Sequence, residues 1–321
     1  MSTAFPPARP GAFVCPAAGI DVSGTWLFWS QPPSPALRRS LECHGQLVPV
    51  LVDASGPRPV LVAGSARVAA LAELGREVLC LDLGVLDWLA RGLVYVQSNL
   101  GRELADWQAV AAMRYFAALP QADLGPALEG LGLEPRSKKL RLVRSWLALP
   151  LHWDLFLAAG NVPLACAELL DGFAPDDLEA VEPLFAGLSW SRGNAVNVLT
   201  WLREICARDA IRAKDVLAAC KTAGILAAGL SPKDAMARVI QELRRRRYPL
   251  LSTMERDFSD AARRVAAGTR WRLVQPDCFE SDAIEIGARL GSVSELRAAS
   301  AELARMADRE DLAALFSPEK R

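Results

Sequence analysis

The sequence predicts an α+β protein in three parts, because two kinds of apolar periodicity alternate along its 321 residues. Short apolar runs separated by glycine and proline turns fill the first hundred residues, and helical spacing of apolar residues then dominates. Both patterns recur near the end. We therefore expect a flexible lead over 1–19, a mixed α/β head over 20–100, an all-helical middle over 101–247 and a small α/β tail over 248–321.

Each part is justified by its own elements. Four apolar or aromatic runs of the head are typical of strands: 25–30, 48–52, 59–62 and 78–83. Two head segments have helical spacing: 35–43, and 67–74, which ends at Gly75. The middle predicts helices at 104–119, 122–131, 137–149, 163–170, 178–184, 194–206, 213–220 and 232–247. The tail predicts helices at 250–266 and 293–307 and strands at 270–274 and 283–290.

Composition excludes several classes of protein. The 37 basic and 37 acidic residues cancel, so any nucleic-acid surface must be a local patch. The seven cysteines form no C-x-x-C pair, which argues against a disulfide framework and a zinc ribbon, and two histidines are too few for a histidine-rich metal site. We expect no metal site. No long apolar stretch predicts a membrane span, and no secretory signal is seen, so a cytoplasmic protein is expected.

A glycine turn in the head has the features of an anion site. The run Val60–Leu61–Val62–Ala63–Gly64–Ser65–Ala66–Arg67 leads from a strand into a helix. A helix start exposes backbone N–H groups and a positive dipole end, and glycine lets the chain approach an anion closely. Ser65 can donate a hydroxyl and Arg67 can pair with a phosphate. Phosphate binding is one interpretation, and a plain strand-to-helix turn with Arg67 in solvent is the other.

The order of the surrounding motifs resembles a known family. Gly45 ends a helix, a strand containing Pro49 follows, then comes the Gly64 turn, and later the segment Ser98–Asn99–Leu100–Gly101–Arg102–Glu103. This series is similar to the N-terminal domain of ParB, the chromosome- and plasmid-partitioning protein, whose fold is shared with sulfiredoxin. The resemblance implies a ParB/sulfiredoxin-like head that holds CTP and magnesium. The residues that it places in that site are Gly64, Ser65, Arg67, Asn99, Arg102 and Glu103.

The departures from the family pattern weaken that site. Ala66 and Ala69 stand where the family has arginines, and each lost charge-assisted contact is worth about 1.5–3 kcal/mol. Two such losses weaken nucleotide binding by about two to four decades. Ser98 replaces a glutamate that the family associates with hydrolysis and the metal. We therefore expect weak or absent CTP binding and no catalytic residue, and a residual CTPase activity is left open.

Two relatives of this fold are disfavoured by the same residues. Sulfiredoxin needs a nucleophilic cysteine in the glycine turn, and Ser65–Ala66 supply none. Cys80 lies within a predicted strand, where an inert buried thiol is expected. A ParB-like nuclease would need clustered metal-binding acids, and Asp53 and Asp82 have no clustered partner. Neither activity is expected.

A basic helix follows in the middle part. Five cations fall within nine residues that contain no acid: Arg136, Lys138, Lys139, Arg141 and Arg144. Leu140, Val143 and Leu147 repeat at helical spacing and should face inward. A preceding helix and Gly132 complete a helix-turn-helix pattern, whose second helix can enter the major groove of DNA while its cations neutralise phosphates. A solvated basic helix is the alternative. The ParB resemblance continues here at Leu147–Ala148–Leu149–Pro150 and favours DNA binding.

Three hypotheses for function follow. The first is a ParB-like DNA-binding protein, in DNA partitioning or transcriptional regulation, that contacts double-stranded DNA and is associated with the nucleoid. The second is a CTP-dependent switch enzyme that retains nucleotide binding at the Gly64 turn. The third is a non-catalytic protein-interaction module. The tail is a candidate homodimer interface, and Arg244–Arg247 are either helix-end cations or a second nucleic-acid contact.

Overall fold

The computed structural model describes residues 11–100, 104–120, 123–313 and 315–316. Its contacts form two compact units, Met1–Leu178 with Leu184–Val196, and Glu179–Pro183 with Asn197–Arg321. The boundaries predicted near residues 100 and 247 lie inside these units and stay predictions. The mixture of helices with a small sheet confirms the predicted α+β class.

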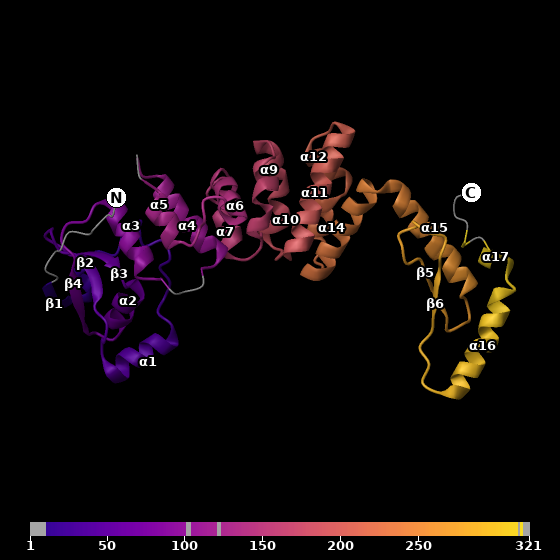
Figure 1. Ribbon diagram of the computed structural model, residues 1–321, viewed down its shortest axis with the longest axis horizontal. Coiled ribbons are helices and arrows are strands. Elements are labelled where there is room, and N and C mark those ends of the chain that lie inside the picture. The colour runs from indigo at the N-terminus through magenta and orange to yellow at the C-terminus, as the bar shows by residue number, and fades with distance from the viewer. Residues whose placement is uncertain (1–10, 101–103, 121–122, 314, 317–321) are drawn as a thin grey trace. The chain divides into compact units, whose positions relative to one another are not determined.

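The head is built on a four-stranded mixed sheet, drawn in indigo to purple in Figure 1. Its strands are β1 (Gly11–Pro16), β2 (Val50–Asp53), β3 (Val60–Ala63) and β4 (Glu77–Asp82), in the order β1-β4-β2-β3. Strand β2 is antiparallel to β3 and parallel to β4, with Val50 opposite Cys80. Strand β1 is antiparallel to β4, with Gly11 opposite Asp82.

Two head predictions were wrong. The flexible lead over 1–19 contains edge strand β1, because Phe13 and Cys15 alternate with exposed residues and Pro16 is tolerated at the end of an edge strand. The predicted strand 25–30 is a series of turns. Two indole hydrogen bonds stabilise these turns: the Trp26 N–H donates to the Leu61 carbonyl at 2.9 Å, and the Trp29 N–H donates to the Gln108 carbonyl at 2.7 Å.

Three helices complete the head: α1 (Pro35–His44), α2 (Ser65–Glu73) and α3 (Trp88–Gln97). Helix α1 begins as its sequence predicts, because the Ser34 hydroxyl accepts the Leu37 N–H and Pro35 occupies the first turn. Helix α3 was not predicted, although the Asp87 carboxylate caps it by accepting the Ala90 N–H at 2.7 Å. It packs against β3.

A buried ion pair ties α3 to the sheet. Asp53 at the end of β2 is 1% exposed and lies 2.8 Å from Arg91 Nη2, whose guanidinium covers the Trp26 ring at 4.7 Å. Burial alone would raise the pKa of Asp53. Hydrogen bonds from the Ser55 hydroxyl, from Arg91 and from the Leu86 N–H outweigh it and lower the pKa from 3.8 to about 2.

The middle part is helical, as predicted. Its helices in the first unit are α4 (Asp106–Ala117), α5 (Gly125–Gly130), α6 (Lys138–Leu147), α7 (Trp153–Ala158), α8 (Ala167–Asp171), α9 (Pro175–Val181) and α10 (Pro183–Ala186). A 3₁₀ turn, Leu164–Cys166, precedes α8, and α7 was not predicted. The helix predicted over 178–184 is divided at Pro183, which lacks an N–H and begins α10.

One arginine joins three of these helices. Arg114 of α4 forms a bidentate pair with Asp154 of α7, with Nε–Oδ2 at 2.5 Å and Nη2–Oδ1 at 2.9 Å. Its guanidinium also donates to the Leu147 and Leu149 carbonyls at the end of α6, at 3.2 and 3.1 Å. Trp146 of α6 donates its indole N–H to the same Asp154 at 2.8 Å. We call this network the Arg114 clamp.

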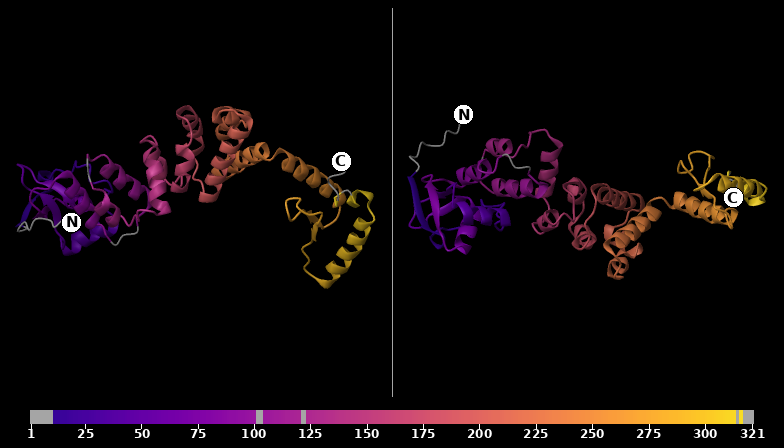
Figure 2. Two further views of the ribbon diagram at one scale, coloured as in Figure 1. Left: turned by 45° about the horizontal axis from the view of Figure 1, so that its top comes forward. Right: turned by 90° about the horizontal axis from the view of Figure 1, so that it is seen from below.

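Apart from Glu179–Pro183, the second unit begins within α11 and continues through the last helices of the middle part to the tail. Its elements are α11 (Arg192–Asp209), α12 (Ala213–Ala219), α13 (Thr222–Ala227), α14 (Pro232–Arg247), α15 (Pro249–Val265), β5 (Arg272–Val274), β6 (Glu285–Gly287), α16 (Val293–Ala307) and α17 (Glu310–Ala313). Strands β5 and β6 form an antiparallel hairpin, which Figure 2 shows with α15 and α16 from two further directions. A small core around Val265 and Met306 holds the tail together.

The Asp53–Arg91 pair predicts a specific acid sensitivity. A carboxylate whose pKa is lower in the folded chain stabilises it above the unfolded pKa and loses that contribution as pH falls toward 2. We expect Asp53→Asn to cost about 2 kcal/mol at pH 7 and about half of that at pH 3, measured by urea unfolding. The exposed Asp106→Asn is the control. An equal cost of Asp53→Asn at both pH values would contradict the role of the pair.

The Arg114 clamp predicts a large effect of one guanidinium. Arg114→Met keeps the aliphatic stem but leaves Asp154 with only the Trp146 indole as donor, and it removes the donor to the Leu147 and Leu149 carbonyls. We expect the free energy of unfolding to fall by about 2–3 kcal/mol, as measured by tryptophan fluorescence during urea unfolding. Arg144→Met, at an exposed position on α6, should stay within about 0.5 kcal/mol of the wild type. Equal effects of the two substitutions would refute the clamp.

Candidate nucleic-acid interface and head pocket

The Gly64 turn has a conformation that only glycine adopts easily. Gly64 lies between β3 and α2 with φ +106°, in the left-handed region. An added Cβ would lie 2.9 Å from Val50 Cγ1 and 3.1 Å from Arg67 Nη2. No side chain caps α2, so its N-terminus is open to a ligand. The turn is therefore shaped as the sequence predicts.

The structure brings four of the six predicted pocket residues together. Gly64, Ser65, Arg67 and Asn99 line one pocket of about 380 Å³. Arg102 and Glu103, the other two, lie outside the described residues. Sequence reasoning missed several lining side chains that come from distant segments: Trp29, Gln31, Ser34, Tyr95 and Gln108. For Trp29 the signal was present as an aromatic run, which was interpreted as a strand.

The side chains of Ser65, Arg67 and Asn99 all make hydrogen bonds within the chain. Arg67 Nη1 donates to the Val48 and Pro49 carbonyls at 2.9 and 2.6 Å. The Asn99 amide donates to the Tyr95 carbonyl at 2.8 Å, and the Ser65 hydroxyl accepts from Ser30 at 3.0 Å. Among the described lining residues Arg67 is the only cation. One guanidinium already held by two carbonyls is a weak site for a triphosphate.

Helix α6 has a buried face and a basic face. The Ser137 hydroxyl begins the helix by accepting the Leu140 N–H at 3.2 Å. Leu140 and Val143 are buried as predicted. Leu142 and Trp146 are also buried, while the predicted inward residue Leu147 is only half-buried. Four of the predicted cations are exposed on or just before this helix: Arg136, Lys138, Arg141 and Arg144.

Two of the five cations have carboxylate partners. Lys139 Nζ lies 3.6 Å from Asp106 Oδ1, and Arg141 pairs with Glu168. Both pairs are exposed, and exposed pairs contribute about 0–1 kcal/mol, so a phosphate can replace either partner at small cost. Within the described part of the chain, Arg136, Lys138 and Arg144 make no ion pair. The cations of the basic face are therefore either unpaired or held by carboxylates that a phosphate can displace.

The predicted helix-turn-helix stays a prediction. Helix α6 packs against α4 and α8, whereas α5 packs against α3. The connection between α5 and α6 spans 131–137, which is longer than the usual turn of about 3–4 residues. Gly132 in this connection has φ +63°.

Cys80 lacks the properties of a reactive cysteine. Cys80 is fully buried in β4, with its Sγ 3.8 Å from Cys15 Sγ. Burial, and then the neighbouring Cys15 thiol, raises the pKa of Cys80 to about 12. Its nucleophilic thiolate is therefore scarce near neutral pH. Across the described ranges no three or more His, Cys, Asp or Glu side chains gather in a way that would hold a metal ion.

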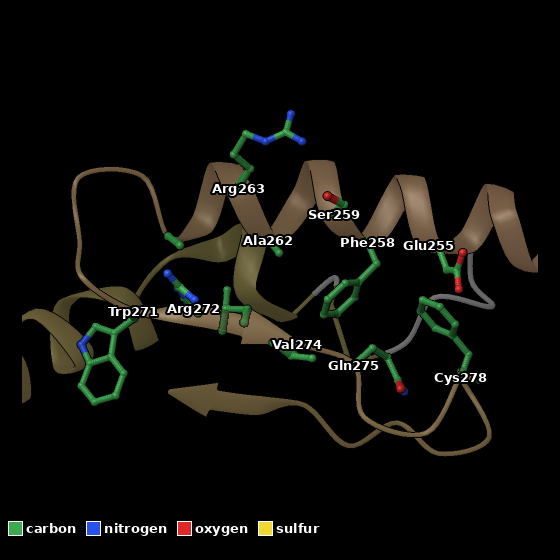
Figure 3. A pocket seen from close by; sticks show the side chains of 13 residues that line it. Glu255, Phe258, Ser259, Ala262, Arg263, Trp271, Arg272, Val274, Gln275 and Cys278 are labelled. Carbon is green, nitrogen blue, oxygen red and sulfur yellow. The ribbon is translucent and has the colours of Figure 1, made fainter. Parts of the chain in front are cut away.

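The tail holds a second cavity, of about 510 Å³, between α15 and β5. Figure 3 shows Phe258 and Val274 beside it and Arg263 pointing away from the hairpin. Its lining is mostly apolar and assigns no chemistry, and the predicted homodimer interface in the tail stays a prediction. In the part of the chain that the structure describes, no helix is both long enough and apolar enough to cross a membrane.

No protein-family model matches this chain, and no curated protein matches it. Two of the solved structures similar to it are of the C-terminally truncated chromosome-partitioning protein ParB from Caulobacter crescentus. The one complexed with CTP-gamma-S has 19% identity and a TM-score of 0.24, and the match covers 54% of this chain and 98% of that one. The one complexed to the centromeric parS site has 15% identity and a TM-score of 0.34, with 71% and 99% covered. The function proposed below rests on the residues of this chain.

Proposed function

We propose that this chain is a ParB-like protein that binds double-stranded DNA through the basic face of α6, in DNA partitioning or transcriptional regulation. The observation that carries the proposal is the division of α6 into two faces. Leu140, Val143 and Trp146 anchor one face in the core, and the cations of the other face are exposed. In a chain whose 37 basic and 37 acidic residues balance, such a face is a local source of positive potential.

The physics of the contact is mainly electrostatic. Each phosphate neutralised by a cation releases a counterion, so affinity falls steeply with salt. Arg136 precedes α6 and Lys138 is its first residue, so both lie at the end of the helix that usually reaches base edges in a recognition helix. The Arg114 clamp holds α6 against α4 and α7. Because α6 is already ordered, it loses little conformational entropy when it binds DNA. Such a protein would be associated with the nucleoid in the cytoplasm, with the tail as the proposed homodimer interface.

In this proposal the head pocket binds CTP weakly or not at all. Its described lining offers one guanidinium and no carboxylate for a magnesium ion. The alternative is a CTP-dependent switch, and it is favoured by one observation, the convergence of Gly64, Ser65, Arg67 and Asn99 on a single pocket.

The DNA contact is tested by charge reversal on α6. Lys138→Glu with Arg141→Glu should weaken binding to a duplex at least tenfold at about 100 mM salt. It should also reduce the slope of log K against log salt by about 2, because about 0.9 is lost for each phosphate contact. Fluorescence anisotropy over a salt series measures both. Arg289→Glu with Arg297→Glu, two exposed tail residues, changes the net charge equally and should have little effect. No duplex binding by the wild type at about 50 mM salt would end the proposal.

The degenerate pocket is tested by restoring its missing arginines. Isothermal calorimetry of the wild type with CTP and magnesium should give a Kd weaker than about 100 μM. Ala66→Arg with Ala69→Arg should tighten it by up to two to four decades, because each new guanidinium can add a contact of about 1.5–3 kcal/mol. Ala66→Met with Ala69→Met controls for side-chain bulk. Tight wild-type binding that Arg67→Ala abolishes would favour the switch instead.

A further inference from the structure

A basic groove lies between α14 and α15, in a different part of the chain from α6. Its volume is about 600 Å³, and four arginines line it: Arg244, Arg245, Arg256 and Arg263. The two helices together carry nine basic and five acidic residues, a net charge of +4 in a chain whose total is zero. This concentration of positive charge is local, as a polyanion site requires.

The run Arg244–Arg247 is divided between two roles. Arg247 pairs with Glu204 at 2.5 Å and covers the Tyr248 ring at 4.7 Å, and Arg246 lies 3.6 Å from Asp209. These two arginines therefore anchor α14 to α11. Arg244 and Arg245 line the groove, which Arg246 and Arg247 do not. A helix-dipole effect at the end of α14 accounts for neither Arg256 nor Arg263, which lie on α15.

The remaining lining includes two carboxylates, Glu255 and Asp260, which pair with Arg244 and Arg263, and several uncharged polar side chains that can bind a phosphate backbone. Ser252, Arg256, Ser259 and Arg263 recur along one face of α15 at helical spacing, opposite Gln241 of α14. Arginine, serine, threonine and glutamine side chains are those that commonly bind DNA phosphates. The described lining contains no aromatic side chain on which an unpaired base could stack, so it favours a duplex over a single strand. Arg256 and Arg263 are two helical turns apart, about 10 Å, close to the rise of about three base pairs.

The ion pairs of the groove leave three arginines available. Arg244 is fixed by a bidentate pair with Glu255, at 2.7 and 3.2 Å, which joins α14 to α15 and shapes the groove. Arg245, Arg256 and Arg263 pair only with acids one or three residues away, and their side chains are 68%, 69% and 75% exposed. Because such exposed local pairs contribute about 0–1 kcal/mol, a phosphate can displace the carboxylate easily.

We propose that the groove between α14 and α15 is a second, sequence-independent contact for the phosphate backbone of duplex DNA. It supplies affinity and not specificity, because its donors reach phosphates and no base edge is read. It is a site separate from α6, and it does not depend on the helix-turn-helix prediction.

The test uses the full chain and a random-sequence duplex in a salt series followed by anisotropy. One variant combines Arg245→Gln, Arg256→Gln and Arg263→Gln. Arg244 is left unchanged, because its pair with Glu255 joins α14 to α15 and keeps the shape of the groove. The slope of log K against log salt should fall by about 2–3, and affinity at about 100 mM salt should fall at least tenfold. The control combines Arg289→Gln, Arg297→Gln and Arg305→Gln, three exposed residues in and before α16, and should leave the slope unchanged. Circular dichroism verifies that both variants are folded.

The outcomes separate this proposal from the one for α6. A slope that falls in the groove variant, and falls further when Lys138→Glu and Arg141→Glu are added, supports both contacts. A fall in the groove variant alone supports the groove and counts against α6. A slope equal to that of the wild type overturns the groove. Wild-type binding to polyglutamate that the groove variant loses, with duplex binding unchanged, also overturns it and indicates an acidic protein partner.

Discussion

The Arg114 clamp fixes the position of α6 and therefore the direction in which its basic face points. One guanidinium from α4 satisfies carbonyls at the end of α6 and the carboxylate of Asp154 on α7, and Trp146 binds that same carboxylate from α6. A bidentate arginine pair with additional backbone bonds fixes direction as well as distance. The clamp contacts lie at the C-terminal end of α6. They therefore hold the basic face in place and leave the first turn, where DNA would bind, uncovered.

Charge in this chain is organised locally, since the total is zero. Buried charge has a structural role: Asp53 and Arg91 join β2 to α3, and neither reaches a pocket described above. Exposed charges form weak ion pairs, such as Arg141 with Glu168 and Arg263 with Asp260. Weak pairs keep a surface neutral on average and let a polyanion compete for the cations. The head pocket differs from both, because its described lining is nearly uncharged.

Local signals predicted much of the fold, and long-range contacts account for the failures. Helical periodicity predicted Pro232–Arg247 and Val293–Ala307 residue for residue, and in the structure Ser231 and Ser292 cap these helices. The segment 25–30 failed because Trp26 and Trp29 find hydrogen-bond acceptors on β3 and α4. In the pocket, motif order identified residues near Gly64 and Asn99 but not Trp29 or Gln108. In α6, the partners of Lys139 and Arg141 come from α4 and α8, which periodicity alone does not place.

Hydrogen exchange of the full chain with and without duplex DNA tests the central claim most directly, because it locates the contact without changing a residue. With a saturating duplex at about 50 mM salt, the account predicts slower exchange of the backbone amides of α6, concentrated in its first turns. Exchange in β2 and β3 should be unchanged. A duplex that binds under these conditions while exchange throughout α6 stays the same would contradict the account.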